Sequence, residues 1–266
     1  MNYINLKNLK DKDLKDFIEK CSQIPDLQFD SEIDPPLPIN PYSKNLEDKI
    51  KIAHYFLIVA SIDEGNLVGR AENARILVVR LYKLLKDNLF SITNVNYLKK
   101  IFTDCLQNLS LSRLKDRIPE IIVSVNQFVI NKGGDNLIKF AQKFETPKDF
   151  VKVLANNIVR MGKSSEVRKK AWMYMRWMVR DYPDLRIFDH FFPKDLFVPV
   201  DNNVLKAAIY LGIAPYRKPL QPAWEDVEKI TQFGRTLYPE DPVKIDYPLF
   251  LLGRELTKED LNLKKS

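Results

Sequence analysis

The sequence contains few of the residues on which several common enzyme chemistries depend. Its 266 residues include only two histidines and two cysteines. A zinc site with four ligands would need all of them, and none stands at the spacing of a zinc motif: Cys21, His54, Cys105 and His190. Glycine is scarce as well, at 8 residues, and there is no Walker A loop, G-x-G-x-x-G fingerprint or G-x-S-x-G elbow. Any catalysis is therefore expected to depend on Asp, Glu, Lys or Tyr, without a metal or cofactor.

The sequence also lacks the features of an exported or membrane-bound protein. Two cysteines far apart are typical of reduced thiols inside a cell rather than of a secreted disulfide framework. The first twenty residues contain no apolar run of the kind found in a signal peptide. The longest apolar stretches, such as residues 55–60, are too short to cross a bilayer. We therefore expect a soluble intracellular protein with no membrane partner.

Positive charge is concentrated in one segment of the chain. The formal net charge is +7, and residues 160–180 hold seven basic residues against one acidic residue, Glu166. The basic residues are Arg160, Lys163, Arg168, Lys169, Lys170, Arg176 and Arg180. Such a segment is typical of a surface that binds polyanions, of which nucleic acid is the commonest in cells. A solvated helix face is the alternative, but a purely solvated face would not contain the apolar residues found at 172–175 and 177–178.

Apolar periodicity and cap residues predict an all-α architecture. Residues 26–42 contain four prolines and are expected to form an extended linker after a first short helix. Thr146-Pro147 and Asp201 are typical helix N-termini. Helices are predicted at 11–23, 45–61, from 71, 93–107, 116–131, 135–143, 147–160, 166–180, 201–211, from 222, and 241–253. We divide the chain into an N-terminal helix and linker (1–44) and two helical subdomains (45–145 and 146–266), with the N-terminal helix packing on the second.

Two features of the second subdomain could support chemistry. Lys169 and Lys170 open a helix within the basic segment, where burial and neighbouring cations would favour a neutral, nucleophilic amine. The alternative is a pair of ordinary surface lysines. Asp201 is expected to cap a helix. The positive end of a helix stabilises a carboxylate charge, so Asp201 could also stabilise a developing cation or act as a base.

A third feature lies near the C-terminus. Asp246 and Phe250 stand one helical turn apart in DPVKIDYPLFLLGRE and therefore face the same way. The alternative interpretation is an ordinary helix whose apolar residues pack into the core and whose one aspartate is exposed. Apolar residues at this spacing usually pack in that way.

Three segments together resemble the helix-hairpin-helix DNA glycosylase superfamily, and most closely its archaeal 8-oxoguanine glycosylase/lyase branch together with a related, functionally uncharacterised family. They are KKAWMYMRWMVRDY, VPVDNNVLKAAIYLGI and DYPLFLLGR, and the resemblance covers residues 147–254. In that branch a nucleophilic lysine opens the second helix of the hairpin, and an aspartate follows a P-V-D or P-L-D tripeptide. The separation of 32 positions between Lys169 and Asp201 matches that branch, whereas Lys170 is one position short. The resemblance therefore implies Lys169 as nucleophile and Asp201 as catalytic carboxylate.

The resemblance also implies binding residues and a few departures. Residues that would contact the extruded base are Met173, Arg176, Asp246 and Phe250, with Arg176 replacing a second lysine of the relatives. Residues that would contact DNA are Lys163, Arg168 and Lys170, with Asn66 as the residue inserted into the gap that the base leaves. The hairpin sequence MGKSSEVRKK departs from the usual L-P-G-[VI]-G form, and the absence of a C-terminal cysteine cluster excludes the iron–sulfur subgroup.

The fold and function implied by the resemblance are specific. We expect two helical subdomains with a helix-hairpin-helix motif and an active site in the cleft between them. The protein would be a prokaryotic, cytoplasmic, nucleoid-associated monomer that binds double-stranded DNA with a damaged base. It would excise 8-oxoguanine through a lysine Schiff base and cleave the strand by β-elimination. Two alternatives stay open: a non-catalytic nucleic-acid-binding module on the same scaffold, and a monofunctional glycosylase for another damaged base.

Overall fold

The computed structural model describes residues 11–22, 40, 42–69, 71–106, 109, 111, 114–163, 165–181, 183–257 and 260–261. In these residues the protein is built from helices, and no β-strand is present among them, which confirms the all-α prediction. The α-helices are α1 (Asp11–Ser22), α2 (Leu46–Ile62), α3 (Gly65–Val68), α4 (Ala71–Leu85), α5 (Val95–Cys105), α6 (Ile118–Asn131), α7 (Leu137–Ala141), α8 (Pro147–Asn157), α9 (Lys169–Val179), α10 (Asn202–Tyr210), α11 (Trp224–Leu237) and α12 (Asp246–Glu255). Short 3-10 helices are η2 (Lys86–Phe90), η3 (Lys115–Arg117), η4 (Pro193–Asp195) and η5 (Pro242–Ile245).

Helix α2 is the centre of the first group of helices. Every residue from Ile52 to Ile62 is buried, as expected of a helix that is apolar on all sides. It packs against α4, α6, α7 and α9. Its one buried imidazole, His54, lies 2.9 Å from Asn126 of α6, and the Asn126 amide donates to the Leu89 and Ile92 carbonyl oxygens. Burial lowers the pKa of His54 to about 4, so this polar contact holds a neutral imidazole in the core.

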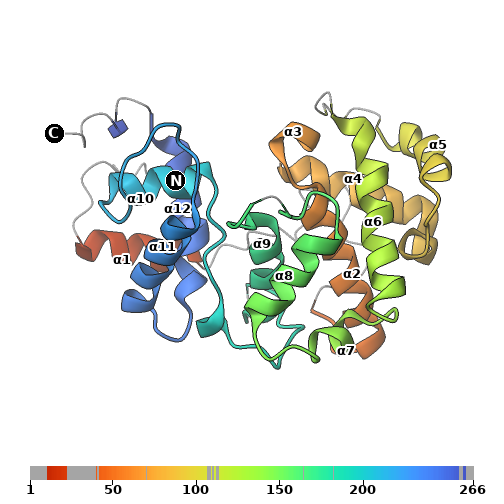
Figure 1. Ribbon diagram of the computed structural model, residues 1–266, viewed down its shortest axis with the longest axis horizontal. Coiled ribbons are helices and arrows are strands. Elements are labelled where there is room, and N and C mark those ends of the chain that lie inside the picture. The colour runs from red at the N-terminus through yellow and green to blue at the C-terminus, as the bar shows by residue number, and fades with distance from the viewer. Residues whose placement is uncertain are drawn as a thin grey trace.

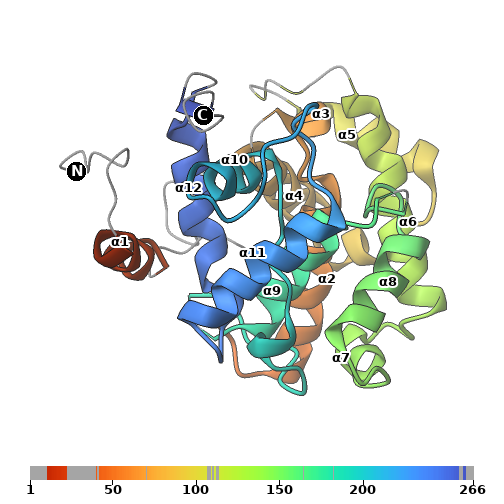
Figure 2. The same cartoon turned by 60° about the vertical axis from the view of Figure 1, so that its left-hand side comes forward.

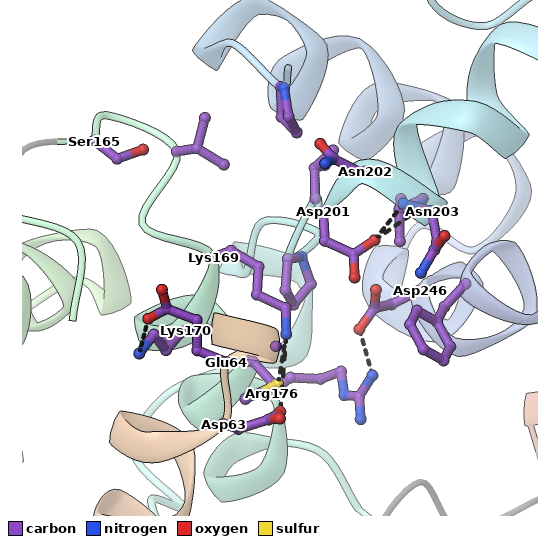
Figure 3. A pocket seen from close by; sticks show the side chains of 18 of the residues that line it. Asp63, Glu64, Ser165, Lys169, Lys170, Arg176, Asp201, Asn202, Asn203 and Asp246 are labelled. Atoms are coloured by element: carbon purple, nitrogen blue, oxygen red, sulfur yellow. Dashed lines mark hydrogen bonds and ion pairs between the residues drawn. The ribbon is translucent and has the colours of Figure 1, made fainter. Parts of the chain in front are cut away.

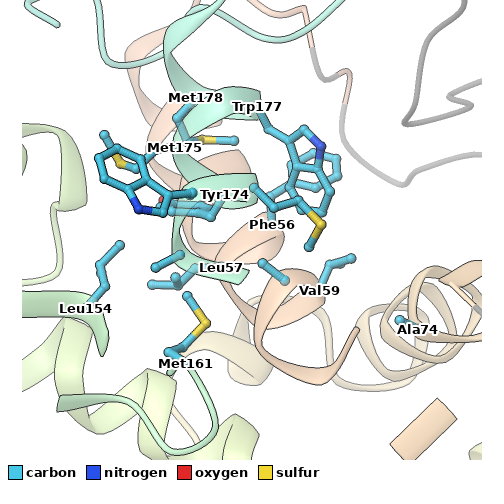
Figure 4. Packing of buried hydrophobic residues seen from close by; sticks show 14 of the residues in the cluster. Phe56, Leu57, Val59, Ala74, Leu154, Met161, Tyr174, Met175, Trp177 and Met178 are labelled. Atoms are coloured by element: carbon cyan, nitrogen blue, oxygen red, sulfur yellow. The ribbon is translucent and has the colours of Figure 1, made fainter. Parts of the chain in front are cut away.

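Helix α9 lies within the basic segment of residues 160–180, and most of the helix is buried in the core. All residues from Ala171 to Val179 are buried, including Arg176. Figure 4 shows Trp177 of α9 packed beside Phe56 of α2, and the two rings meet edge to face at 6.0 Å. The Tyr174 hydroxyl of α9 donates to the Ala53 carbonyl oxygen of α2 at 3.0 Å. The interpretation of residues 160–180 as one basic surface is therefore wrong at Arg176 and Arg180, which are buried.

A second group consists of α1, α10, α11 and α12. Figure 1 shows these helices on one side of α9 and the helices α2 to α7 on the other, and Figure 2 shows α11 crossing in front of α9. Helices α10 and α12 approach so closely that a Cβ atom on Gly253 would lie 1.9 Å from the Asn203 carbonyl oxygen, so only glycine fits there. Helix α1 packs against α12 and η5, and Lys244 forms an ion pair with Glu19 at 2.6 Å.

The two groups divide the chain differently from the predicted subdomains. Helices α8 and α9 pack against each other, and α9 packs on α2, so both belong with the first group. The boundary predicted between residues 145 and 146 thus falls inside that group. The segment that follows α9, residues 180–201, leads into the second group.

Candidate functional site

A cavity of about 690 Å³ lies where the two groups of helices meet. The end of α2 and the start of α3 supply one wall, α9 supplies the floor, and α10 and α12 supply the opposite wall. Seven of the residues predicted from the sequence line it: Lys169, Lys170, Met173, Arg176, Asp201, Asp246 and Phe250. These residues come from α9, from the residue that precedes α10 and from α12, so the fold brings together what the sequence spreads over about eighty positions.

Helix α9 presents three of these side chains along one face. Lys169, Met173 and Arg176 are four and three residues apart, the spacing at which side chains stack on one side of a helix. The Lys169 Nζ lies 3.3 Å from the Met173 Sδ and 3.9 Å from the Oδ2 of Asp63. The Lys169 side chain is 30% exposed, so its amine can be reached from the cavity.

Lys170 occupies a different environment from its neighbour. Its Nζ donates to the Ser61 carbonyl oxygen at 2.7 Å and pairs with Glu64 at 3.0 Å, and the side chain is only 11% exposed. Burial lowers the pKa of Lys170, although the Glu64 carboxylate acts in the opposite direction. A cation held in this way is poorly placed to contact DNA phosphates, so the predicted DNA-binding role of Lys170 is not supported by its position.

Glu64 connects the α2–α3 turn to α9 and to the segment before it. It also pairs with Arg160, which has a left-handed backbone conformation with φ of 66°. Burial raises the pKa of Glu64, but the Lys170 and Arg160 cations outweigh this effect and leave the pKa below its ordinary value. The resulting cluster of three charges fixes the wall of the cavity next to Lys169.

Asp201 caps α10, as predicted. Its Oδ1 accepts the backbone N–H groups of Asn203 at 2.8 Å and Val204 at 2.9 Å. Both capping bonds use the same oxygen. Figure 3 shows the carboxylate pointing into the cavity, on the side of α10 that faces Lys169 and Asp246. The positive end of α10 therefore holds a negative charge at the cavity surface.

Asp246 and Arg176 form a buried ion pair between Oδ2 and Nη1 at the back of the cavity. Their side chains are 8% and 3% exposed. Arg176 also lies 3.8 Å from Asp184, which pairs with Arg180 at 2.7 Å. Arg180 in turn pairs with Asp241 at 2.7 Å, so the network joins α9 to the segment before α12. Arg176 and Asp246, both predicted to contact an extruded base, are therefore paired with each other, and Arg176 occupies one Asp246 oxygen.

The remaining predicted residues lie away from this constellation. Lys163 is exposed on the segment between α8 and α9, and Arg168 immediately precedes α9 in a left-handed conformation with φ of 46°. Neither is among the described residues that line the cavity. Asn66 lies in α3, but its side chain is outside the part of the chain that the structure describes.

Two acidic residues of the site, Asp63 and Glu64, were not predicted from the sequence. Both line the cavity from the turn between α2 and α3. The available signal was a pair of acidic residues directly after a long buried helix and before Gly65. That signal indicates a helix end, and only the packing of α2 on α9 places it beside the lysines.

Metal-binding clusters and membrane-spanning helices are absent from the described residues. In this part of the chain, no group of three or more His, Cys, Asp or Glu side chains is arranged to hold a metal ion. Over the same residues, no helix has the length and apolar character that a membrane span requires.

Comparison with known proteins places the chain in one family. The search of curated proteins found no match. A family model with the description "Protein of unknown function (DUF2400)" matches residues 80–255, which include α9 to α12 and begin after Asp63. Because this match covers more than half of the sequence, the chain belongs to the DUF2400 family of proteins of unknown function.

Proposed function

We propose that this protein is a bifunctional DNA glycosylase and abasic-site lyase that excises an oxidised purine, 8-oxoguanine first, from double-stranded DNA. The observation that carries the proposal is the meeting of an accessible amine, Lys169, and a helix-capping carboxylate, Asp201, in one cavity with Phe250. An enzyme that acts on a base inside a duplex must extrude that base into a pocket. The cavity volume of about 690 Å³ is within the range typical of small-molecule sites.

The aromatic wall of the cavity suits a planar base. Phe250 is partly buried and stacks on Tyr247 with ring planes 16° apart, and the Arg254 guanidinium lies 5.8 Å from the Phe250 ring centre. An extruded base would stack on Phe250 and reach the Arg176–Asp246 pair at the back of the cavity. Guanine oxidised at C8 gains an N–H donor at N7 in addition to its N1–H and N2 donors, and a carboxylate oxygen of Asp246 can accept from such an edge.

The carboxylate and the amine would act in sequence on the sugar. Cleavage of the glycosidic bond develops positive charge on the sugar ring, and the fixed charge of Asp201 stabilises that state electrostatically. The Lys169 amine then bonds to C1′, and the Schiff base that follows permits β-elimination of the 3′ phosphate. The neighbouring Lys170 would not perform this attack, because its amine is bound to Ser61 and Glu64.

The segment between α8 and α9 would hold the DNA backbone. It contains left-handed residues at Arg160, Gly162 and Arg168 and leads directly into the N-terminus of α9. Within the described residues, the Arg168 side chain does not cap the first turn of α9. Backbone N–H groups at a helix N-terminus attract phosphate, and the exposed Lys163 adds a positive charge nearby.

Borohydride trapping on a duplex that contains 8-oxoguanine tests this proposal. Reduction of the Schiff base should attach the protein covalently to the DNA. The Lys169→Gln variant should bind the duplex but form no adduct, whereas Lys152→Gln, which changes an exposed lysine of α8, should react like the native protein. Base release without an adduct would instead indicate a monofunctional glycosylase. Binding without base release would indicate a non-catalytic module.

A further inference from the structure

Asp63 and Asp201 face the amine of Lys169 from opposite sides of the cavity. Asp63 belongs to the first group of helices, and Asp201 belongs to the second. Asp63 follows the last residue of α2, and its backbone N–H donates to the Val59 carbonyl oxygen at 3.0 Å. Its side chain is 18% exposed, lines the cavity, and places Oδ2 3.9 Å from the Lys169 Nζ. Figure 3 shows the Lys169 side chain extending toward Asp63.

The chain on both sides of Asp63 is fastened to the start of α9. Lys170 donates to the Ser61 carbonyl oxygen two residues before Asp63 and pairs with Glu64 one residue after it. Arg160 holds Glu64 from a second direction. Because Lys170 follows Lys169 directly, the same contacts that position Asp63 also fix the first turn of α9. The approach of Asp63 to Lys169 is thus built into the packing rather than left to two mobile side chains.

The carboxylates of Asp63 and Asp201 lie at opposite ends of their helices. Asp201 lies at the N-terminus of α10, and its Oδ1 is occupied by two backbone N–H groups. Asp63 lies at the C-terminal end of α2, where the helix dipole favours the arrival of positive charge. The N-terminus of α10 suits a carboxylate whose charge must persist through the reaction. The C-terminal end of α2 suits a carboxylate that receives a proton.

We propose that Asp63 is a catalytic residue that accepts the proton of the Lys169 ammonium and so releases the amine for attack on C1′. This inference rests on the proposed function. The proton moves from Nζ to the Asp63 carboxylate, and the freed electron pair forms the Nζ–C1′ bond. The electron pair of the broken C1′–base bond leaves with the base, which takes the proton from Asp63 and restores the carboxylate.

The same exchange operates at an abasic site. There the amine adds to the C1′ aldehyde, whose π electrons move to oxygen. Asp63 carries two protons in turn from Nζ to that oxygen, which leaves as water. The product is the protonated Schiff base, and Asp63 again ends as a carboxylate. An abasic duplex therefore tests Asp63 without any requirement for recognition of a damaged base.

A proton acceptor and a simple charge partner differ in the effect of removing them. A carboxylate that only stabilised the ammonium would hold Lys169 in its unreactive form, so its loss would leave the rate unchanged or raise it. A proton acceptor contributes a factor of roughly 10²–10⁴ to the rate, so its loss would lower the rate by that factor. Added hydroxide should replace a missing acceptor, which makes the rate of the deficient variant rise steeply with pH.

The experiment measures single-turnover borohydride trapping on an abasic duplex between pH 6 and 9. We expect Asp63→Asn to trap 10²–10⁴-fold more slowly than the native protein at pH 7 and to gain about tenfold per pH unit above that. Asp63→Glu, which keeps a carboxylate, should recover at least tenfold over the asparagine variant. Asp104→Asn, which removes an exposed carboxylate from α5, should match the native protein.

The outcomes separate this inference from the proposed function. Native protein that never traps overturns both. Native protein that traps, with Asp63→Asn equally fast or faster at pH 7, overturns the role of Asp63 alone. Equal loss in Asp63→Asn and Asp63→Glu, together with a lower unfolding midpoint in urea for both, assigns Asp63 to structure and also overturns the inference.

Discussion

Replacement of Asp201 by asparagine or alanine should separate its charge from its role as a helix cap. Asparagine keeps an oxygen in the position of Oδ1, which accepts the N–H groups of Asn203 and Val204. Asparagine and aspartate are about equally good cap residues. Alanine removes both the charge and the acceptor. The pair of variants therefore differs in the cap, whereas both lack the charge.

The expected magnitudes follow from these contacts. Loss of a cap typically costs about 1 kcal/mol, with a range of roughly 0.5–2 kcal/mol, so Asp201→Ala should lower the free energy of unfolding by that amount. Each kcal/mol lost lowers the Tm by about 2–4 °C in a protein of about 150–250 residues. Asp201→Asn should stay close to the native stability. Both variants should release 8-oxoguanine more slowly, by a factor of about 10²–10³, the usual loss on removal of one fixed electrostatic group.

Urea unfolding and single-turnover base release provide the two measurements. Asp195→Asn, which neutralises an exposed aspartate of η4, serves as the matched control and should change neither quantity. If Asp201→Asn is as unstable as Asp201→Ala, the capping geometry is not the one described above. If Asp201→Asn releases the base at the native rate, the charge of Asp201 has no part in the reaction and the reasoning fails.

Three further predictions concern the DNA surface, the pocket and the core. The affinity for duplex DNA should fall steeply as the salt concentration rises. Lys163→Gln and Arg168→Gln should each reduce the slope of log K against log salt by about one. If the variants have the same slope as the native protein, these residues do not belong to the interface. Phe250→Ala should slow release of every base that is accepted, with 8-oxoguanine released fastest from a panel that also contains uracil, thymine glycol and hypoxanthine, and Phe192→Ala, at an exposed site, should have no effect. Because burial lowers the pKa of His54 to about 4, only the unfolded chain takes up this proton between about pH 6.5 and 4. The free energy of unfolding should therefore fall by about 1.4 kcal/mol per pH unit as the pH is lowered through this window, and His54→Gln should remove that part of the slope in pH-dependent urea unfolding.

Local signals in the sequence predicted the helices well because caps act over three or four residues. Thr146 caps α8 and Asp201 caps α10, each through its side-chain oxygen, as predicted. The predicted start of α9 at residue 166 is three residues too early. Arg168 has a left-handed conformation there, and an α-helix does not continue through such a residue. Nothing in the local pattern indicates that conformation.

The parts of the site that depend on distant contacts could not be predicted from the pattern. Arg176 belongs to a run of basic residues and resembles part of a charged surface. Its burial is stabilised by Asp184 and Asp246, the second of which lies 70 positions away. Asp63 likewise became part of the site only through the packing of α2 on α9. The local patterns and the resemblance both indicated Lys169, Asp201, Asp246 and Phe250, and neither indicated Asp63.

Identification of the lysine that becomes attached to DNA tests the central claim most directly. The borohydride-trapped adduct on a duplex that contains 8-oxoguanine can be digested with protease and nuclease, and the modified peptide can be sequenced by mass spectrometry. We predict a single modified residue, Lys169, whose amine lies in the cavity with Asp63 and Asp201. Attachment at Lys170 or at a lysine outside the cavity, or no adduct despite DNA binding, would contradict it.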